Sequence, residues 1–244
     1  MGGVIRSANY CYIKDIHKPS ADAMRIGGRL FLFSANNKKT NMRRLLTLFL
    51  CAICAMSAWA EITPSQPAAG TGTPSDPYQI TNREELYWFV AETNNDKTVC
   101  AKLIADIVVN EGTFDSDGKW SKPGTPESWK PMAVYGGIFD GNGHTIKNMT
   151  ITDNNLKVIG FIGTASSCTV KDINFENAFI TSNRSILNVG IAAGSGTLPG
   201  KSTFTNVKTS GILDLYAVLK SINYGSIAGG FVENTLNNCS SEVM

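Results

Sequence analysis

Few residues in this sequence have the types and spacing that catalysis requires. His144 is the sole histidine after Ala60, so neither a paired-histidine zinc site nor a histidine-based nucleophile triad is supported. Glycoside hydrolases use two carboxylates about 5 to 9 Å apart, and the nearest candidates are Asp140 and Asp172. These two residues occupy different positions of the sequence repeat described below. We therefore predict no catalytic residues, and a protein that is not an enzyme.

Two tryptophans are the candidate ligand-binding residues. Trp120 and Trp129 lie in the second half of a polar stretch, 111–130, and an indole ring offers a large apolar face to a sugar. A ring that closes a loop onto the core is the commoner use of such a residue, and it is the interpretation that we favour. Asp115-Ser116-Asp117-Gly118 is a fragment of a calcium-loop pattern that lacks the remaining ligands and the closing glutamate. We therefore predict a solvated turn there, and neither a metal nor a cofactor.

The part of the chain after residue 135 repeats a pattern of two parts. The first part is a glycine followed by apolar residues, and the second is apolar, any, Asn or Asp, apolar. The first parts start at Gly137, Gly160, Gly190 and Gly225, and the second parts start at Ile146, Val170, Phe204 and Leu236. From 137 to 160, 160 to 190 and 190 to 225 the intervals are 23, 30 and 35 residues, which is typical of stacked repeats.

Alternation of apolar and polar residues, β-branched enrichment and Gly/Asn turns predict that these repeats are strands. A short strand unit cannot bury its apolar face alone, whereas units stacked at about 4.8 Å share one core. We therefore predict an all-β chain folded as a right-handed parallel β-helix, or β-solenoid, with an N-terminal capping helix. The residues expected to maintain the repeat are Gly137, Gly141, Gly160, Gly163, Gly190, Gly225, Gly229, Asn148, Asp172, Asn206 and Asn238.

Two columns of polar residues follow from this alignment. The first column contains Asn148, Asp172, Asn206 and Asn238. Their side chains can hydrogen-bond along the stack, or each can make a local turn, and the two interpretations are compatible. The second column contains His144, Cys168, Ser202 and Asn234. Because that position accepts small and polar residues alike, we predict a structural role for His144, next to the turn formed by Asn142-Gly143.

The segment before residue 131 is expected to lead into the array and to cap it. Residues 61–77 are rich in Pro, Ala, Gly, Ser and Thr, which predicts a flexible linker. Residues 78–130 predict an N-terminal cap made of a helix over 82–94, a strand over 102–109 and a long loop. The helix is expected to start with the capping-box spacing of Thr81 and Glu84.

Residues 131–244 predict about four stacked units of this β-solenoid. No second cap follows the fourth unit, so we expect that the solenoid is truncated at the C-terminus. An open last unit leaves unpaired backbone groups, and such edges associate with one another. The sequence therefore predicts edge-to-edge self-association.

The N-terminal residues have the features of export. Residues 42–60 begin with Met42-Arg43-Arg44, continue with an apolar run and end with Ala58-Trp59-Ala60, as a secretory signal peptide does. Because a signal begins a protein, we interpret residues 1–41 as a disordered stretch that results from an upstream start, the alternative being an unusually long leader. We therefore expect a secreted or cell-surface protein with no membrane span beyond the signal peptide.

Charge and cysteine content narrow the partners. The whole sequence has a net charge of +2, but the residues after Ala60 comprise 13 basic and 18 acidic ones, a net charge of −5. This balance argues against a nucleic-acid partner. The cysteines after Ala60 are Cys100, Cys168 and Cys239, an odd and scattered set that predicts no disulfide framework. Cys239 is expected to be a small buried apolar residue.

Several segments resemble the bacterial GLUG-motif repeat proteins. They are Gly72-Thr73, Tyr78 to Thr81, Glu84 to Leu86, Lys102 to Ile107, Trp129 to Met132, Gly137 to Met149 and Gly160 to Gly163. The resemblance covers roughly residues 70 to 244, and Ala192-Ala193 and Ser226-Ile227 depart from its bulkier residues. It implies a secreted or cell-surface protein of the type common in gut Bacteroidetes, with an adhesive role or with the repeat beside a separate catalytic domain.

Two classes of function follow. The first is a non-catalytic module for adhesion or ligand binding, whose partner is a glycan or a host extracellular protein. Its loops near 153–157, 181–187 and 197–201 are expected to contact that partner, because loops on a rigid scaffold carry function. The alternative is a β-helix carbohydrate-active enzyme, or a non-catalytic part of a larger secreted enzyme. Carboxylates clustered on one solvent face would favour the enzyme.

Overall fold

The structure is a computed structural model of the chain. It describes residues 23–26, 29–32, 62–183, 188–196, 200–215, 223–230 and 234–244. The chain divides into two units, Met1–Ala60 and Glu61–Met244. In the first unit β1 (Ala23–Ile26) pairs antiparallel with β2 (Arg29–Leu32), within the stretch 1–41 that was expected to be disordered. The expected signal peptide, 42–60, lies outside the described residues.

The second unit is mostly β and its sheets are parallel, so the prediction of fold class is confirmed at this level. The long sheet orders β3 (Tyr78–Ile80), β4 (Ala101–Leu103), β7 (Ile138–Asp140), β12 (Thr169–Ser182), β15 (Thr203–Leu215) and β18 (Thr235–Asn237). It also includes β5 (Ile107–Val108), β8 (Thr145–Lys147), β9 (Thr150–Ile151) and β19 (Ser240–Val243). The second sheet contains β6 (Met132–Tyr135), β11 (Ile162–Ala165), β14 (Ala193–Gly196) and β17 (Ala228–Gly230). The third contains β10 (Val158–Ile159), β13 (Asn188–Val189) and β16 (Asn223–Tyr224).

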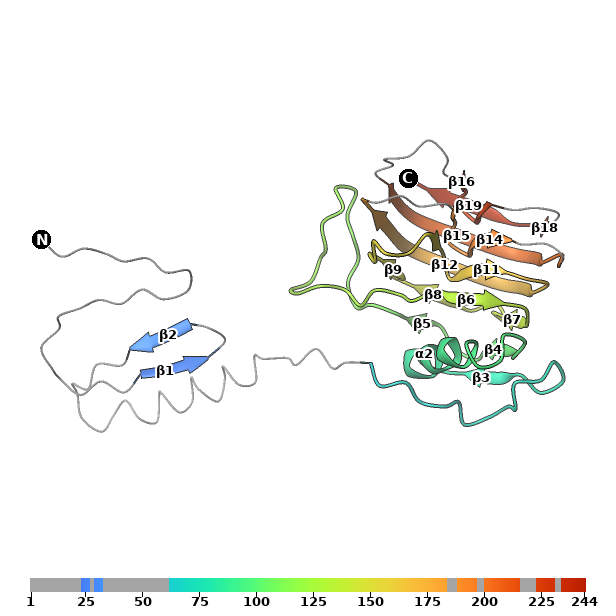
Figure 1. The fold of residues 1–244 in the computed structure, drawn as a ribbon, viewed down its shortest axis with the longest axis horizontal. Helices are drawn as coiled ribbons and strands as arrows, with labels where there is room; N and C mark the ends of the chain where they lie inside the picture. Colours follow the sequence, from blue (N-terminus) through green and yellow to red (C-terminus); the bar gives the residue numbers. More distant parts are fainter. Residues whose placement is uncertain are drawn as a thin grey trace, which may run out of the picture. The chain divides into compact units, whose positions relative to one another are not determined.

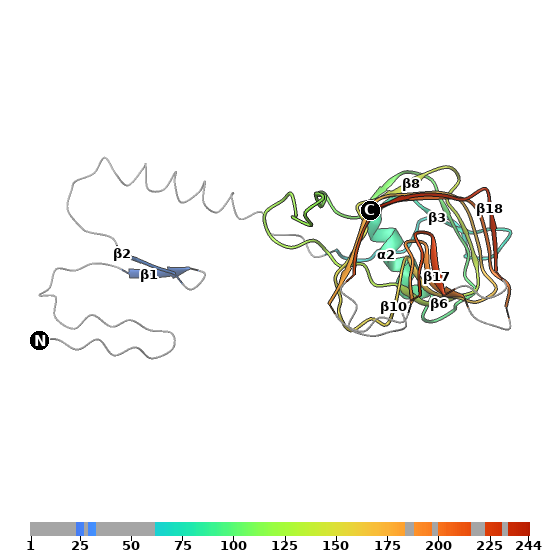
Figure 2. The ribbon, with the colours of Figure 1, turned by 90° about the horizontal axis from the view of Figure 1, so that it is seen from above.

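The strands stack as successive layers along the chain (Figure 1). We name 132–151, 158–182, 188–215 and 223–243 layers one to four, because each contributes strands in parallel register to the sheets. Ile138 pairs with Thr169, Thr169 with Thr203 and Thr203 with Thr235, so the intervals are 31, 34 and 32 residues. In Figure 2, which views the stack from above, the strands of the layers follow nearly the same outline.

This register corrects the sequence alignment of layer one. The interval from Gly137 to Gly160 was predicted to be one repeat, but Ile162 pairs with Met132. Gly137 instead precedes Ile138, whose partner in layer two is Thr169. In layers two to four the alignment is correct, because Ile159 pairs with Val189 and Val189 with Tyr224, and each of these residues directly precedes a glycine. Gly160, Gly190 and Gly225 therefore occupy equivalent positions.

The ladder of polar side chains is shorter than predicted. Asn238 Nδ2 donates to Asn206 Oδ1 at 2.7 Å, and Asn206 Nδ2 donates to Asp172 Oδ1 at 2.6 Å. These residues also have positive φ angles of 49°, 53° and 53°. They therefore both hydrogen-bond along the stack and form local turns, as the two interpretations of the column predicted. Asn148 belongs to another column, because its backbone N–H donates to Glu176 O and its counterpart is Asn177.

One helix, α2 (Arg83–Glu92), covers the end of the core before layer one in the described residues (Figure 1). Its N-cap is Asn82, whose side chain accepts from Glu85 N at 2.9 Å. Glu85 Oε2 accepts from the backbone N–H of Thr81 at 2.7 Å, so the expected capping box is shifted by one residue. Phe89 is fully buried, and its ring centroid lies 5.9 Å from that of Phe139.

Two segments before layer one, the predicted linker and the predicted strand of the cap, differ from the structure. The stretch 61–77 was predicted to be a flexible linker, but its backbone bonds to the first strands: Ala69 O accepts from Gln79 N at 2.9 Å, and Gly72 O accepts from Cys100 N at 2.7 Å. The expected strand over 102–109 is interrupted, because a bend at 104–105 separates β4 from β5. This bend lets the chain turn a corner of the long sheet.

The core is a column of aromatic rings enclosed by the sheets. Phe161 lies at its centre, with ring centroids 5.0 Å from Phe139, 5.1 Å from Phe175 and 5.1 Å from Trp129. All four side chains are fully buried. Because the rings come from different layers or from the segment before β6, each layer is stabilised mainly by its neighbours.

The cysteines of the second unit are not disulfide-bonded in the described residues. Cys100 and Cys168 are buried, and burial raises the pKa of the Cys168 thiol to about 11. Cys239 is half-buried and occupies the column of Ile173 and Val207. The enclosed side chains of Cys100 and Cys168 contribute apolar volume to the core.

Candidate ligand-binding cleft

The two tryptophans have different environments, and the prediction that Trp129 binds a ligand is wrong. Trp129 is fully buried, its Nε1 donates to Phe161 O at 3.2 Å, and its ring is stacked on Phe161. Neither face is open to a ligand. Trp120 is half-buried in the loop 111–130, with its ring centroid 5.0 Å from that of Phe114. A Cβ atom at Gly112 would lie 2.5 Å from the Trp120 ring, so this ring packs against its own loop.

The acidic turn of this loop is held by hydrogen bonds to one carboxylate oxygen of Asp115. Asp115 Oδ1 accepts from Asp117 N at 3.0 Å and from Lys119 N at 2.8 Å. These bonds hold the turn with Gly118 at a φ of +72°. In the described part of the chain, no group of three or more His, Cys, Asp and Glu side chains could hold a metal ion.

The candidate carboxylates are engaged in separate interactions. Asp140 Oδ2 lies 2.8 Å from Lys171 Nζ, and Asp172 Oδ1 accepts from Asn206. The hydrogen bond to Asp140 raises the pKa of Lys171. Each carboxylate therefore has its own partner, and the structure does not join Asp140 and Asp172 into one site.

His144 was predicted to share a column with Cys168. In the structure it lies instead in a row of charged side chains. Its carbonyl accepts from Asn174 N, and its Nδ1 lies 3.3 Å from Asp106 Oδ1. Lys147 Nζ lies 3.7 Å from Asp106 Oδ2 and 3.8 Å from Glu176 Oε2. A hydrogen bond from Thr145 N lowers the pKa of Asp106. The row joins neighbouring strands by exposed ion pairs, which contribute little stability individually.

The loop 111–130 leaves the stack and folds back onto its outer face. Figure 1 shows it projecting beside β9 and β12. Phe114 and Trp120 form an isolated antiparallel bridge across the loop. The Phe114 ring stacks on Phe179 of β12, with centroids 3.7 Å apart and planes inclined by 12°. Phe179 is outside the interior core cluster, so this contact anchors the loop to the outside of layer two.

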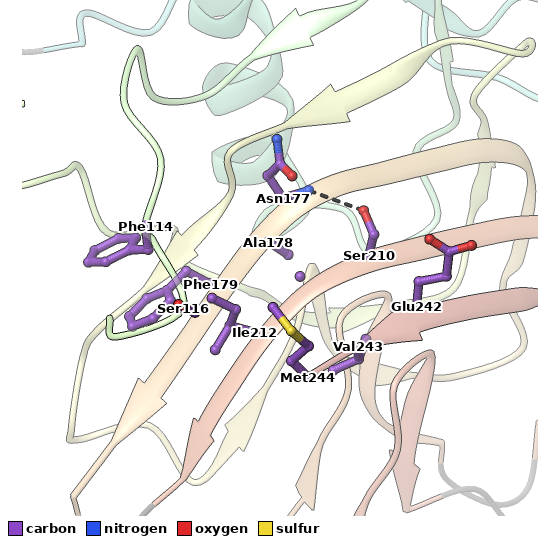
Figure 3. A pocket seen from close by; sticks show the side chains of 11 residues that line it. Phe114, Ser116, Asn177, Ala178, Phe179, Ser210, Ile212, Glu242, Val243 and Met244 are labelled. Carbon is purple, nitrogen blue, oxygen red and sulfur yellow. Dashed lines mark hydrogen bonds between the residues drawn. The ribbon is translucent and has the colours of Figure 1, made fainter. Parts of the chain in front are cut away.

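A cleft of about 480 Å³ lies between this loop and the outer face of layers two to four (Figure 3). Its lining residues are Phe114, Ser116, Asn177, Ala178, Phe179, Ser210, Gly211, Ile212, Glu242, Val243 and Met244. Its volume falls in the range of small-molecule sites, and its lining combines apolar side chains with a few polar groups. This cleft is the candidate functional site.

The polar groups of the cleft come from three successive layers. Asn177 stands at a corner of β12 with a φ of 54°, and its backbone N–H donates to Ser210 Oγ at 3.3 Å. Ser210 of β15 is in register with Glu242 of β19. Neighbouring strands lie about 4.8 Å apart, so these residues form a row along the stack, visible in Figure 3.

Sequence reasoning missed this site, although one signal for it was present. Asn177 is followed by the apolar run Ala178-Phe179-Ile180, where strict alternation would place a polar residue at Phe179. Of the loops expected to contact a ligand, 153–157 is described, but it does not line the cleft. Residues 184–187 and 197–199 of the other two loops lie outside the described residues.

We predict that Phe114→Ala loosens the loop without unfolding the layers. The substitution removes a stacked aromatic pair, and such pairs contribute about 0.5–1.5 kcal/mol beyond their buried area. Amide hydrogen exchange measured by mass spectrometry should become faster in peptides from 111–122 and stay unchanged in β12. Val134→Ala, at a partly exposed position of β6, is the control and should leave the loop unchanged. Equal loop exchange in Phe114→Ala and the parent would contradict the anchoring role.

The fold and the cleft define a mostly β protein of parallel sheets with a ligand-sized hollow on one outer face. No family model matches the chain. Halomucin from Haloquadratum walsbyi is 28% identical over 153 residues, which cover 59% of this chain and 2% of halomucin. A solved chain from Bacteroides ovatus, described provisionally as an immunoglobulin A1 protease, is 20% identical with a TM-score of 0.47 and covers 72% of this chain. That match spans 59% of the solved chain.

The described residues contain no helix with the length and apolar character of a membrane span.

Proposed function

We propose that the second unit is a non-catalytic ligand-binding module of a secreted or cell-surface protein. The carrying observation is the cleft, in which a row of polar side chains faces an apolar wall on a rigid stack of sheets. Pockets of about 300–1,000 Å³ with this mixed lining are the usual place for small ligands. The partner is a glycan or a host extracellular protein, and the role is adhesion or ligand capture.

The fold that we propose for this module is a right-handed β-solenoid of the GLUG-repeat type. The parallel register with intervals of 31, 34 and 32 residues supports a coil that advances by one strand per turn. Crossovers between parallel strands of one sheet are almost always right-handed. The equivalent glycines Gly160, Gly190 and Gly225 and the short Asn/Asp ladder support the repeat type.

Secretion is supported by the sequence. Residues 42–60 have the charged start, apolar middle and small-residue end of a signal peptide. The GLUG resemblance implies the same compartment. A surface role also suits the net charge of −5 after Ala60, which keeps a protein soluble and disfavours nucleic acid.

Binding is favoured over catalysis by the carboxylates. Glycoside hydrolysis needs two carboxylates on either side of one bond, whereas Glu242 is the one carboxylate side chain among the cleft-lining residues. Asp106, just before β5, and Glu176 of β12 lie on either side of Lys147 of β8, and each approaches Lys147 Nζ within 3.8 Å. The alternative function is a carbohydrate-active enzyme or a part of one. It would require a pair of carboxylates other than Asp106 and Glu176, which both face Lys147.

We predict that the full chain binds a component of a glycan array or an extracellular-matrix protein array and releases no product. Bound ligand should be recovered with unchanged mass after incubation, because the cleft offers contacts without a paired acid and base. Mass spectrometry of the ligand distinguishes binding from turnover. The proposal fails if neither array gives a signal, or if a shorter product accumulates with time.

A further inference from the structure

We infer that the cleft binds a pyranose sugar that carries no acidic group, and that the Asn177 amide is its main polar contact. The inference rests on the proposed function and specifies its ligand. It draws on three features of the described residues: an amide that does not join the polar ladder, a row of groups suited to hydroxyls, and the charge of the cleft lining.

The first feature is the side chain of Asn177. Corner asparagines elsewhere in the stack donate to the layer before them, as Asn206 and Asn238 do at 2.6 and 2.7 Å. The residue before Asn177 in its column is Asn148, and Asn148 Oδ1 is buried with no hydrogen-bond partner among the described residues. Asn177 is exposed and lines the cleft. Its amide is therefore free to contact a ligand.

The second feature is the chemistry of the polar row. Ser210 Oγ accepts from Asn177 N, so the hydroxyl hydrogen of Ser210 remains available to a ligand. Glu242 is exposed and contributes acceptor oxygens one strand further along. An amide donates and accepts, a hydroxyl donates, and a carboxylate accepts. Sugar hydroxyls, which both donate and accept, match such an alternating row.

The apolar wall of the cleft matches the other face of a sugar ring. The half-buried side chains of Phe114 and Ile212 and the exposed side chain of Met244 line it, while Phe179, which is 4% exposed, lies beneath the Phe114 ring (Figure 3). The C–H face of a pyranose is apolar, and aromatic and aliphatic side chains bury such faces favourably. A ligand with one apolar face and a hydroxyl edge therefore fits both sides of the cleft.

The third feature is the charge around the cleft. Glu242 is the one charged side chain among the lining residues. The loop that forms the opposite wall carries Asp115 and Asp117, with Lys119 as its nearby cation, all exposed. Like charges at close range disfavour binding. A sugar acid would meet the Glu242 carboxylate, whereas a neutral sugar or an amino sugar would not be repelled.

The test uses isothermal titration calorimetry of the full chain with four probes. They are cellohexaose, a glucosamine hexamer, a galacturonic acid hexamer and a lysine-rich decapeptide. We expect the neutral and amino sugars to bind, and the sugar acid to bind more weakly by about tenfold or more, which corresponds to one step of about 1.4 kcal/mol in binding free energy. The decapeptide is positively charged, as the glucosamine hexamer is, but it has no pyranose ring.

Two substitutions test the contacts. Asn177→Gly keeps the positive φ of 54° accessible and removes the amide, so both sugars should bind about tenfold more weakly. Glu242→Gln keeps the size and removes the charge, so the discrimination against the sugar acid should decrease. The matched controls are Asn142→Gly, at an exposed corner with a φ of 51°, and Glu111→Gln, at an exposed position outside the cleft. Both controls should bind as the parent does.

The outcomes separate this inference from the proposed function. Binding of the decapeptide or of a matrix protein, with no sugar bound, would overturn the inference and leave a binding module. Sugar binding that Asn177→Gly leaves unchanged would overturn the site. Tighter binding of the galacturonic acid hexamer would overturn the ligand class. If no probe binds and both arrays are silent, the proposed function fails together with the inference.

Discussion

Replacing Trp129 with alanine should lower the free energy of unfolding by about 3–5 kcal/mol, the usual loss for a buried tryptophan. The indole is fully buried and stacks on Phe161, with centroids 5.1 Å apart. Its removal leaves a cavity between layers and deprives Phe161 O of one of its two donors, the other being Met132 N. Tyr87, whose ring centroid lies 5.2 Å away, would lose an aromatic neighbour as well. Backbone atoms of β-strands cannot collapse into the space without breaking strand pairs.

Urea denaturation followed by circular dichroism measures this loss without relying on tryptophan fluorescence. Trp120→Ala is the matched control, because that ring is half-buried in the loop 111–130 and contacts Phe114. The control should cost much less than Trp129→Ala, since the loop can relax into solvent. Equal losses for the two variants would show that Trp129 is not a core residue.

The contrast between the two tryptophans shows what the sequence could not decide. Both lie in the same polar stretch, and both offer the same indole chemistry. Their burial depends on where the chain re-enters the stack: Trp129 lies three residues before the start of β6, whereas Trp120 pairs with Phe114 across the loop. That point of re-entry is set by packing between layers, which local composition does not encode.

Fold class was predictable because the alternation of apolar and polar residues survives in every layer. The register of layer one was not predictable, because the corners of the long sheet share the same local sequence feature, an Asn or Asp residue. Asn142 and Asn148 both have positive φ in layer one, as Asp172 and Asn177 do in layer two. Either residue of one layer can be aligned with either residue of the next. Pairing of Ile146 with Phe175 resolves the choice, and places Asn148 beside Asn177.

The cleft could not be predicted because its walls are far apart in the sequence. Phe114 belongs to a loop before layer one, and Glu242 to the last strand. Only the stacking of β12, β15 and β19 brings Asn177, Ser210 and Glu242 into one row. The apolar residue Phe179 signals that something covers the outer face of β12, but the sequence does not identify Phe114 as the cover.

Gly190→Ala should lower the free energy of unfolding by about 3 kcal/mol, near the upper end for overpacking. A Cβ atom at Gly190 would lie 2.4 Å from Ala193 O and 2.6 Å from Ala228 Cα. Both are backbone atoms, one in its own layer and one in layer four, so neither can rotate away as a side chain would. The layers must separate, which weakens strand hydrogen bonds such as that from Gly225 N to Val189 O, now 3.0 Å long.

Two other glycines separate this clash from other costs of adding a methyl group. Gly163→Ala places its Cβ 3.1 Å from Ala133 O and should cost less, because a small shift of the chain relieves the contact. Gly143→Ala has no atom within 4 Å but a φ of +83°, so it should report backbone strain alone, about 1–2 kcal/mol. Urea denaturation should rank Gly190→Ala as the most destabilising of the three. If Gly143→Ala costs more than Gly190→Ala, backbone conformation and not the spacing of layers explains why the stacked positions are glycine.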